Sequence, residues 1–234
     1  AEGKTALAGL RPTYLPKDEI PAGDETNRLH RWGYRHYKEM FNARQLLGLE
    51  LSCRAIEKVE DSRIRNALAT NLSDLLRYQN MLCRYDTMAL KSLDIFSVHG
   101  FPVGLVQCES NFLGIQSMSG VNIGSGGWGN IIDKYTKAKQ YCDAPFEVKY
   151  DGGKKTIVNI EKEWIGEKWN GDGSRKKRSV DLRCANSMEA DIAPNSLDAV
   201  FTDPPYFGNV QYAELMDFCY VWLRQIAKEP SQAF

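Results

Sequence analysis

Leu197-Asp198-Ala199-Val200-Phe201-Thr202-Asp203-Pro204-Pro205-Tyr206 is the stretch on which the fold prediction depends. Residues 197–202 are short and mainly apolar, as is typical of a strand buried in a parallel sheet. Open α/β sheets bind their ligands beyond the carboxyl ends of the strands. We therefore predict an α/β fold in which residues 203–206 lie at such an end.

The surrounding residues fit alternating strands and helices. Residues 146–150 and 156–160 alternate apolar and polar side chains, and Asp-Gly-Gly at 151–153 predicts a hairpin turn between them. Residues 179–184 predict a further strand. Residues 212–226 predict a helix with one apolar stripe, formed by Tyr212, Leu215, Cys219 and Trp222.

The first hundred residues have a different pattern. Residues 1–27 carry three prolines and no apolar periodicity, which predicts an extended arm or linker. Apolar residues recur every three or four positions between residues 32 and 93, enough for two or three helices. We divide the chain into this arm, a helical region at 28–100 and an α/β segment at 101–234.

Composition excludes several classes of protein. Lys+Arg and Asp+Glu are both 30, so a strongly basic nucleic-acid coat is excluded. There is no run of about 18 apolar residues and no apolar core of a signal peptide, so we expect a cytoplasmic protein that does not bind membranes.

The six cysteines form no C-x-x-C pair and there are only three histidines. We expect reduced, mostly buried thiols and no metal site.

Residues 203–206 carry the clearest chemical signal. Two prolines fix the backbone and remove its donors, which leaves carbonyl groups facing outward. The carboxylate of Asp203 and the carbonyl of Pro204 can accept both hydrogens of an exocyclic amine, and the ring of Tyr206 offers a face for a planar base. This chemistry suits methylation of a base amino group. The alternative is a Pro-Pro turn with an incidental tyrosine.

Asp203-Pro204-Pro205-Tyr206 resembles the D-P-P-Y motif of S-adenosylmethionine-dependent adenine-N6 DNA methyltransferases. The longer string at 201–223, which begins Phe-Thr-Asp-Pro-Pro-Tyr-Phe-Gly-Asn-Val-Gln-Tyr, resembles the DUF1156-type prokaryotic adenine-specific DNA methylases. Residues 40–47, Met-Phe-Asn-Ala-Arg-Gln-Leu-Leu, resemble a segment of the same family to which we can assign no mechanism. The resemblance extends from about residue 32 to the end of the chain.

This resemblance implies part of a Rossmann-like methyltransferase with a helical N-terminal region and a β-hairpin insert. It implies S-adenosylmethionine as cofactor and double-stranded DNA as partner, with a flipped adenine held by Asp203, Pro204, Pro205 and Tyr206. Restriction or phage-defence proteins are further possible partners. Cofactor contacts fall on Thr202 and on Asn186, where the family more often has an acidic residue. A turn asparagine is the equal alternative for Asn186.

No F-x-G-x-G cofactor loop lies next to residues 203–206, so we expect this segment to supply the base pocket and to bind no S-adenosylmethionine by itself. Gly-Ser-Gly-Gly-Trp-Gly at 124–129 is a literal G-x-G-x-x-G before a predicted helix, but no buried strand precedes it. We favour a flexible loop there over a cofactor site.

Two basic stretches, residues 28–38 and 175–178, are candidates for phosphate contacts. In the first, packing of its aromatic residues on the helices is an equal alternative; for the second we favour a solvated loop. Two other functions remain open for the chain. One is methylation of an RNA amino group, and the other is non-catalytic binding of nucleic acid.

Overall fold

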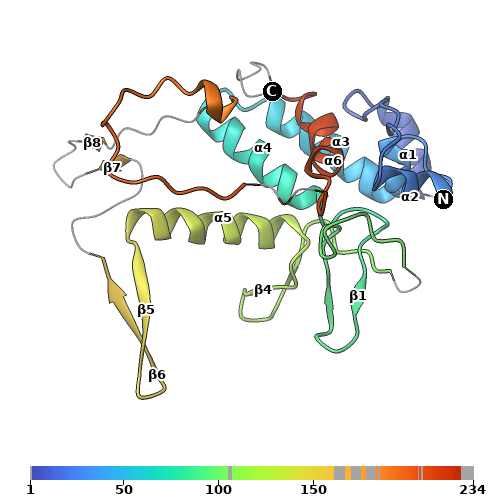
Figure 1. Ribbon diagram of the computed structural model, residues 1–234. Helices are drawn as coiled ribbons and strands as arrows, with labels where there is room; N and C mark the ends of the chain where they lie inside the picture. The colour runs from blue at the N-terminus through green and yellow to red at the C-terminus, as the bar shows by residue number, and fades with distance from the viewer. Residues whose placement is uncertain are drawn as a thin grey trace. The chain divides into compact units, whose positions relative to one another are not determined.

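The computed structural model describes residues 2–104, 107–160, 183, 185–204, 206 and 208–227, together with the backbone of 167–169 and 175–177 (Figure 1). The chain forms two compact units. Unit 1 comprises Ala1–Ile131 and Asn195–Ser231, and unit 2 comprises Ile132–Pro194 and Gln232–Phe234. Because residues 203–206 belong to unit 1, that unit positions the predicted site.

Unit 1 is built mainly from helices. Its helices are α1 (Glu2–Leu10), α2 (Thr26–Arg31), the 3-10 helix η1 (Tyr37–Met40), α3 (Ala43–Glu57), α4 (Ser62–Leu76) and α6 (Tyr212–Leu223). Helix α1 packs on α3, α3 on α4, and α4 on α6. Helices α3 and α4 confirm the prediction of helices between residues 32 and 93.

Side-chain caps determine where α3 and α4 begin. The side chain of Asn42 accepts hydrogen bonds from the backbone N–H groups of Arg44 and Gln45, at 2.9 and 3.0 Å. Gln45 in turn accepts from the N–H of Asn42 at 2.9 Å, which completes a capping box. Asp61 caps α4 by accepting from the N–H groups of Arg63 and Ile64, so each helix begins where a polar side chain satisfies its first free donors.

Within the described residues, strands occur as four separate antiparallel pairs. Unit 1 contains β1 (Tyr85–Asp86) with β2 (Lys91–Ser92), and β3 (Ile115–Gln116) with β4 (Asn122–Ile123). Unit 2 contains β5 (Phe146–Asp151) with β6 (Lys154–Asn159), β7 (Glu167–Trp169) with β8 (Arg175–Lys177), and the 3-10 helix η2 (Ser187–Glu189). Helix α5 (Trp128–Asp143) begins in unit 1 and continues into unit 2. The described residues contain no parallel strand pair, so the Rossmann-like sheet remains an expectation.

An aromatic cluster joins distant segments of unit 1. The ring of Phe41 stacks on Phe218, with centroids 5.6 Å apart, and meets the edge of Trp222 at 5.2 Å. Phe96 and Phe101 also pack against Phe218. Burial of such rings is the largest apolar contribution available to a core, and edge-to-face pairs add to it. Helix α6, which follows the 203–206 segment, is therefore held by residues more than a hundred positions away.

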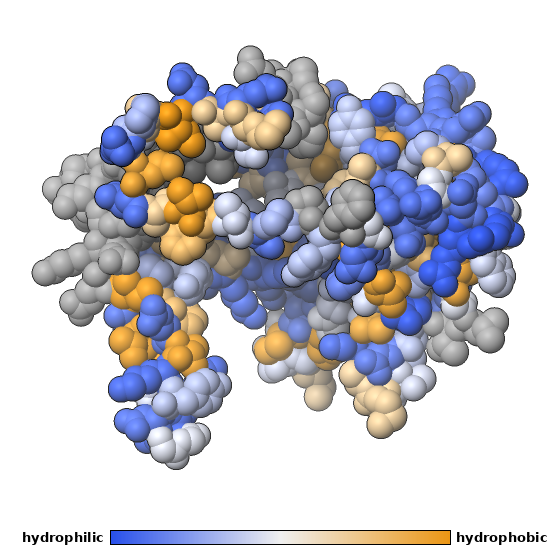
Figure 2. All heavy atoms as spheres, in the orientation of Figure 1, coloured by the Kyte–Doolittle hydropathy of each residue, from blue (hydrophilic) through white to orange (hydrophobic). Residues whose placement is uncertain are grey.

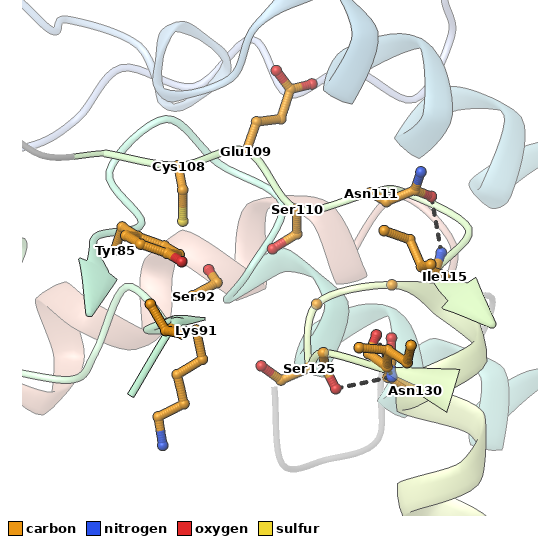
Figure 3. A pocket seen from close by; sticks show the side chains of 16 residues that line it. Tyr85, Lys91, Ser92, Cys108, Glu109, Ser110, Asn111, Ile115, Ser125 and Asn130 are labelled. Carbon is orange, nitrogen blue, oxygen red and sulfur yellow. Dashed lines mark hydrogen bonds between the residues drawn. The ribbon is translucent and has the colours of Figure 1, made fainter. Parts of the chain in front are cut away.

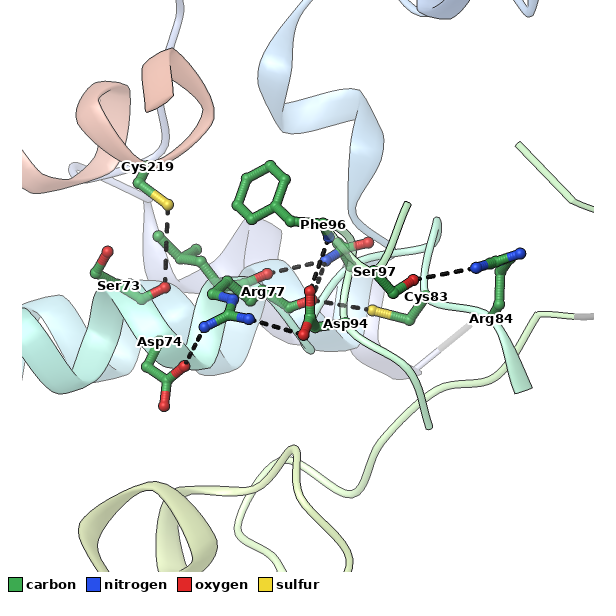
Figure 4. A network of polar contacts seen from close by, with 11 residues as sticks. Ser73, Asp74, Arg77, Cys83, Arg84, Asp94, Phe96, Ser97 and Cys219 are labelled. Atoms are coloured by element: carbon green, nitrogen blue, oxygen red, sulfur yellow. Dashed lines mark hydrogen bonds and ion pairs between the residues drawn. The ribbon is translucent and has the colours of Figure 1, made fainter. Parts of the chain in front are cut away.

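A polar network lies beside this cluster (Figure 4). Arg77, at the end of α4, pairs with Asp74 at 3.2 Å and with Asp94 at 2.7 Å. The other oxygen of Asp94 accepts from the backbone N–H of Phe96 at 2.8 Å. The network fixes the loop that contains Phe96, whose ring packs in the aromatic cluster.

The hairpin predicted at 146–160 is confirmed as β5 and β6. Its turn contains Gly152 and Gly153 at φ 54° and 79°, a left-handed conformation that glycine adopts without steric cost. Every described residue of both strands is exposed, including Tyr150 and Ile157, and Figure 2 shows apolar side chains along the hairpin.

The structure differs from two predictions. Residues 197–202 form no strand, and Val200 and Phe201 are 71% and 94% exposed. A buried parallel strand requires hydrogen-bonded neighbours on both sides, and the described residues supply none. Residues 2–27 are not an extended arm, because they include α1 and the buried residues Tyr14, Ile20 and Thr26. The strand predicted at 179–184 lies outside the described residues, apart from Arg183.

Candidate functional site

Asp203, Pro204 and Tyr206 are exposed and lie in a segment without regular secondary structure, just before α6. Tyr206 is 68% exposed, and its backbone carbonyl accepts from the N–H of Asn209 at 3.3 Å. Gly208 has φ 66°, so the chain turns there before α6 begins at Tyr212. Pro205 lies outside the described residues. The exposed ring face of Tyr206 is available for stacking.

Asp203 has an exposed side chain. Among the described residues, none donates a hydrogen bond to its carboxylate. Phe201 and Val200 precede it and are also exposed, so an apolar surface adjoins the carboxylate along the chain. Asp203 and Tyr206, three positions apart in the sequence, are both exposed, and their binding of an amine stays a prediction.

Glu214 anchors α6 to the N-terminal segment of unit 1. Its carboxylate accepts hydrogen bonds from the backbone N–H groups of Asp24, Glu25 and Thr26 at 3.0, 3.0 and 2.9 Å, and from the Thr26 hydroxyl at 3.1 Å. Burial raises the pKa of Glu214, but these hydrogen bonds outweigh it, and the net pKa lies below the ordinary 4.5. The first turn of α6 is thus fixed eight residues after Tyr206.

Asn186 and Thr202, the predicted cofactor contacts, belong to different units. The side-chain oxygen of Asn186 accepts from the N–H of Met188 at 3.1 Å, and its Nδ2 donates to Glu189 at 3.3 Å. Asn186 therefore caps η2, which matches the turn alternative. Thr202 is exposed in unit 1.

The glycines at 124–129 serve packing rather than anion binding. A Cβ on Gly127 would lie 2.3 Å from the backbone nitrogen of Gly114, and a Cβ on Gly126 would lie 2.4 Å from Ser110 Oγ. The first N–H groups of α5 are also engaged, because Trp128 and Gly129 donate to the carbonyls of Phe112 and Leu113 at 3.0 Å each. An anion at a helix N-terminus requires free N–H groups, and these are not free.

A cavity of about 360 Å³ lies next to this loop (Figure 3). The β1–β2 hairpin supplies the lining residues Tyr85, Lys91 and Ser92, and the glycine-rich loop with the start of α5 supplies Ser125 and Asn130. The Nδ2 of Asn130 donates to the carbonyl of Gly124 at 2.9 Å. The segment at 108–111 lies between them and includes the thiol of Cys108. Lys91 is the one cationic side chain among the lining residues.

A second cavity of about 420 Å³ shares Glu109, Ser110, Asn111 and Ile115 with the first. Its other lining residues are Arg44, Gln45, Gln79 and Phe112. Sequence reasoning did not identify Gln79, for which no local pattern gives a signal. Arg44 and Gln45 fall within the segment at 40–47 that carries the family resemblance, and the Asn42-to-Gln45 spacing of a capping box is the local signal for Gln45.

The basic stretch at 28–38 is only partly available to a ligand. Tyr37 is 1% exposed, and Tyr34 packs against the core. Arg35 donates to the carbonyls of His30 and Tyr34 at 2.8 and 3.1 Å. Only Trp32, at 63% exposed, offers an open aromatic face. For the second stretch, only the backbone of residues 175–177 is described.

The described cysteines are free thiols, and Cys53, Cys83 and Cys219 are buried, whereas Cys108 and Cys142 are half-buried. Burial raises the pKa of Cys53 and of Cys83 to about 12. Among the described residues, no group of three His, Cys, Asp or Glu side chains is placed to hold a metal ion. Within the same residues, no helix is long and apolar enough to cross a membrane.

Comparison of the chain with protein-family models, with curated proteins and with solved structures gave no match.

Proposed function

We propose that this chain supplies the base-binding part of an S-adenosylmethionine-dependent methyltransferase that acts on the N6 amino group of adenine in DNA. The observation that carries the proposal is the sequence Asp203-Pro204-Pro205-Tyr206, in which both the carboxylate and the ring are exposed. The anchored helix α6 supports it, because a fixed element directly after the segment limits how far the base-binding groups can move.

In this proposal a flipped adenine stacks on Tyr206, which contributes about 1–3 kcal/mol against the few kcal/mol that flipping costs. Asp203 and the carbonyl of Pro204 accept the two N6 hydrogens. These contacts orient the nitrogen lone pair and raise its electron density in the transition state. When bound, S-adenosylmethionine would supply the methyl group from its sulfonium and leave as the neutral thioether. The proton that leaves N6 passes to Asp203 or to water.

The test is a methyl-transfer assay of the full-length gene product with S-adenosylmethionine labelled in its methyl group. Duplex DNA and RNA are offered as separate acceptors, and the products are digested to nucleosides. We expect the deoxynucleoside of N6-methyladenine, from DNA only. N4-methylcytosine would contradict the assignment to adenine, and labelled RNA alone would favour the RNA alternative. Binding of nucleic acid without any transfer would favour a non-catalytic module.

A further inference from the structure

The β5–β6 hairpin has an apolar face that is exposed along both strands. Directly opposite residues of an antiparallel pair point to the same face. The register therefore places on one face the three pairs Phe146–Asn159, Val148–Ile157 and Tyr150–Lys155. Of these residues, Tyr150 is 69% exposed and Ile157 is 58% exposed. A two-stranded hairpin is only marginally stable in water, so an open apolar face on one points to a partner that covers it.

The base of the hairpin is fixed and its tip projects. The N–H of Ile160 donates to the carbonyl of Pro145 at 2.9 Å. The ring of Phe146 meets the ring of Tyr141 in α5 edge-on, with centroids 5.3 Å apart. Figure 1 shows the hairpin extending away from the end of α5. Each strand has six residues, which at a rise of about 3.3 Å per residue makes the hairpin an arm about 20 Å long.

The charges on this arm favour an anionic partner. Its acidic residues, Glu147 and Asp151, both lie on the other face, so the apolar face carries the cation of Lys155 and no acidic side chain. Lys149 and Lys154 add two cations toward the tip, where Figure 2 shows mainly hydrophilic side chains. Within the described residues, no ion pair neutralises any of the three lysines. The arm therefore combines an apolar face with unpaired positive charge near its tip.

The shape of the arm fits the major groove of B-form DNA. That groove is about 12 Å wide and about 8.5 Å deep, and it admits a two-stranded β-ribbon. Its floor presents base edges and thymine methyl groups, which suit an apolar and aromatic face, and its rims are lined by phosphates, which suit lysines. The arm is longer than the groove is deep, so its tip can reach the floor while its base stays outside.

We infer that the β5–β6 hairpin enters the major groove of duplex DNA and is a surface by which the chain holds its substrate. Val148 and Tyr150 face the base edges, and the lysines of the tip contact the phosphates. The choice of DNA as the ligand rests on the proposed function. The surface itself belongs to unit 2, whereas residues 203–206, which would bind the flipped adenine, belong to unit 1.

Fluorescence anisotropy of a short labelled duplex, titrated with the 234-residue chain, tests the inference. The variant replaces Lys149, Lys154 and Lys155 by alanine. Each phosphate contact contributes about 0.9 to the slope of log K against log salt concentration. We therefore expect the slope to become shallower by about 2 to 3 and the affinity to fall on the order of tenfold or more. Every substituted side chain is exposed, so the melting temperature should stay that of the wild type.

The matched control replaces Lys4, Lys17 and Lys58 by alanine. These lysines are exposed in unit 1, and their loss changes the net charge of the chain by the same amount. We expect wild-type affinity and an unchanged salt slope. Equal weakening by the two triple variants would reduce the effect to net charge and overturn the inference, as would the absence of DNA binding by the wild-type chain.

Tyr150→Ala tests the apolar face separately. It should lower the affinity for the duplex on the order of several-fold without changing the salt slope, since the ring carries no charge. Duplex RNA should bind the wild type more weakly than duplex DNA, because the major groove of an A-form helix is too deep and narrow for side chains to read. Unchanged affinity in Tyr150→Ala, or RNA bound as tightly as DNA, would contradict insertion into the groove.

These binding results are independent of methyl transfer, which the assay of the full-length gene product measures. DNA binding that depends on the hairpin, without transfer to any acceptor, would remove the proposed function and keep the inference. Transfer to DNA by a protein whose affinity does not respond to the hairpin variants would keep the proposed function and remove the inference.

Discussion

The carboxylate of Glu214 accepts hydrogen bonds from both the backbone N–H and the hydroxyl of Thr26, at 2.9 and 3.1 Å, although the two residues are 188 positions apart. Gly23 makes this approach possible, since a Cβ at that position would lie 2.4 Å from the carboxylate. Glu214 therefore joins the helix after the 203–206 segment to the first turn of α2.

Glu214→Gln should destabilise unit 1. The amide keeps two lone pairs on one oxygen but loses the negative charge, and hydrogen bonds to charged groups are the stronger ones. We expect the free energy of unfolding to fall by about 2 kcal/mol, measured by urea denaturation. Glu147→Gln, on the exposed strand β5, is the matched control and should change it by less than about 0.5 kcal/mol. Equal effects of the two substitutions would contradict the anchoring role.

The contribution of Glu214 to stability should depend on pH. Its folded pKa is below the unfolded value near 4.5, since the hydrogen bonds from residues 24–26 outweigh burial. The stabilisation is therefore fully present above about pH 4.5 and is lost as pH falls through the lower folded pKa. We expect the difference in unfolding free energy between wild type and Glu214→Gln to be constant from pH 6 to about pH 5 and to shrink below. A difference that grows on acidification would contradict this sign.

Gly127→Ala should be strongly destabilising because the added Cβ would lie 2.3 Å from backbone of Gly114, which cannot move like a side-chain end. We expect a loss of about 1–3 kcal/mol or more in unfolding free energy. Gly9→Ala in α1 is the matched control, since a Cβ there would meet no other atom within 4 Å. That substitution should be neutral or stabilise by up to about 1 kcal/mol. If Gly127→Ala were as stable as the wild type, the flexible loop predicted from the sequence would again be the better interpretation of residues 124–129.

Local patterns in the sequence predicted several elements of this chain, although not α1. The spacing of apolar residues located α3, α4 and α6, and the Asp-Gly-Gly turn located the β5–β6 hairpin. Each of these elements depends on residues within about four positions of one another, or on a turn of fixed geometry. The capping box of Asn42 and Gln45 is a signal of the same local kind.

Features that depend on distant residues were not predictable in this way. Residues 197–202 have the composition of a strand, but a strand also requires neighbours, and composition does not report them. The segment at 2–27 is ordered against other elements through contacts such as that of Thr26 with Glu214. Gln79 reaches the carbonyl of Gly126 across 47 positions, and no spacing rule connects the two.

If Tyr206 acts by stacking, Tyr206→Phe in the full-length gene product should keep methyl transfer within about threefold, because the ring face is retained. Tyr206→Ala should lower kcat/KM by about 10- to 100-fold, in line with stacking worth about 1–3 kcal/mol. Tyr85→Ala removes another exposed tyrosine and should leave kcat/KM unchanged. A large loss of kcat/KM in Tyr206→Phe would mean that the hydroxyl, and not the ring face, is needed for methyl transfer.

Asp203→Ala in the full-length gene product should abolish methyl transfer while duplex binding stays within about threefold, because phosphate contacts dominate affinity for DNA. The predicted reason is that the carboxylate acts only on the N6 amino group in the pocket. Asp198→Ala is the matched control, an exposed carboxylate five residues earlier in the same segment, and it should retain both activities. Methyl transfer and duplex binding are measured on the same preparations, by product digestion and by titration of a labelled duplex. Near-normal turnover in Asp203→Ala would remove the carboxylate from the mechanism, whereas parallel loss of transfer and binding would assign it to DNA contact instead.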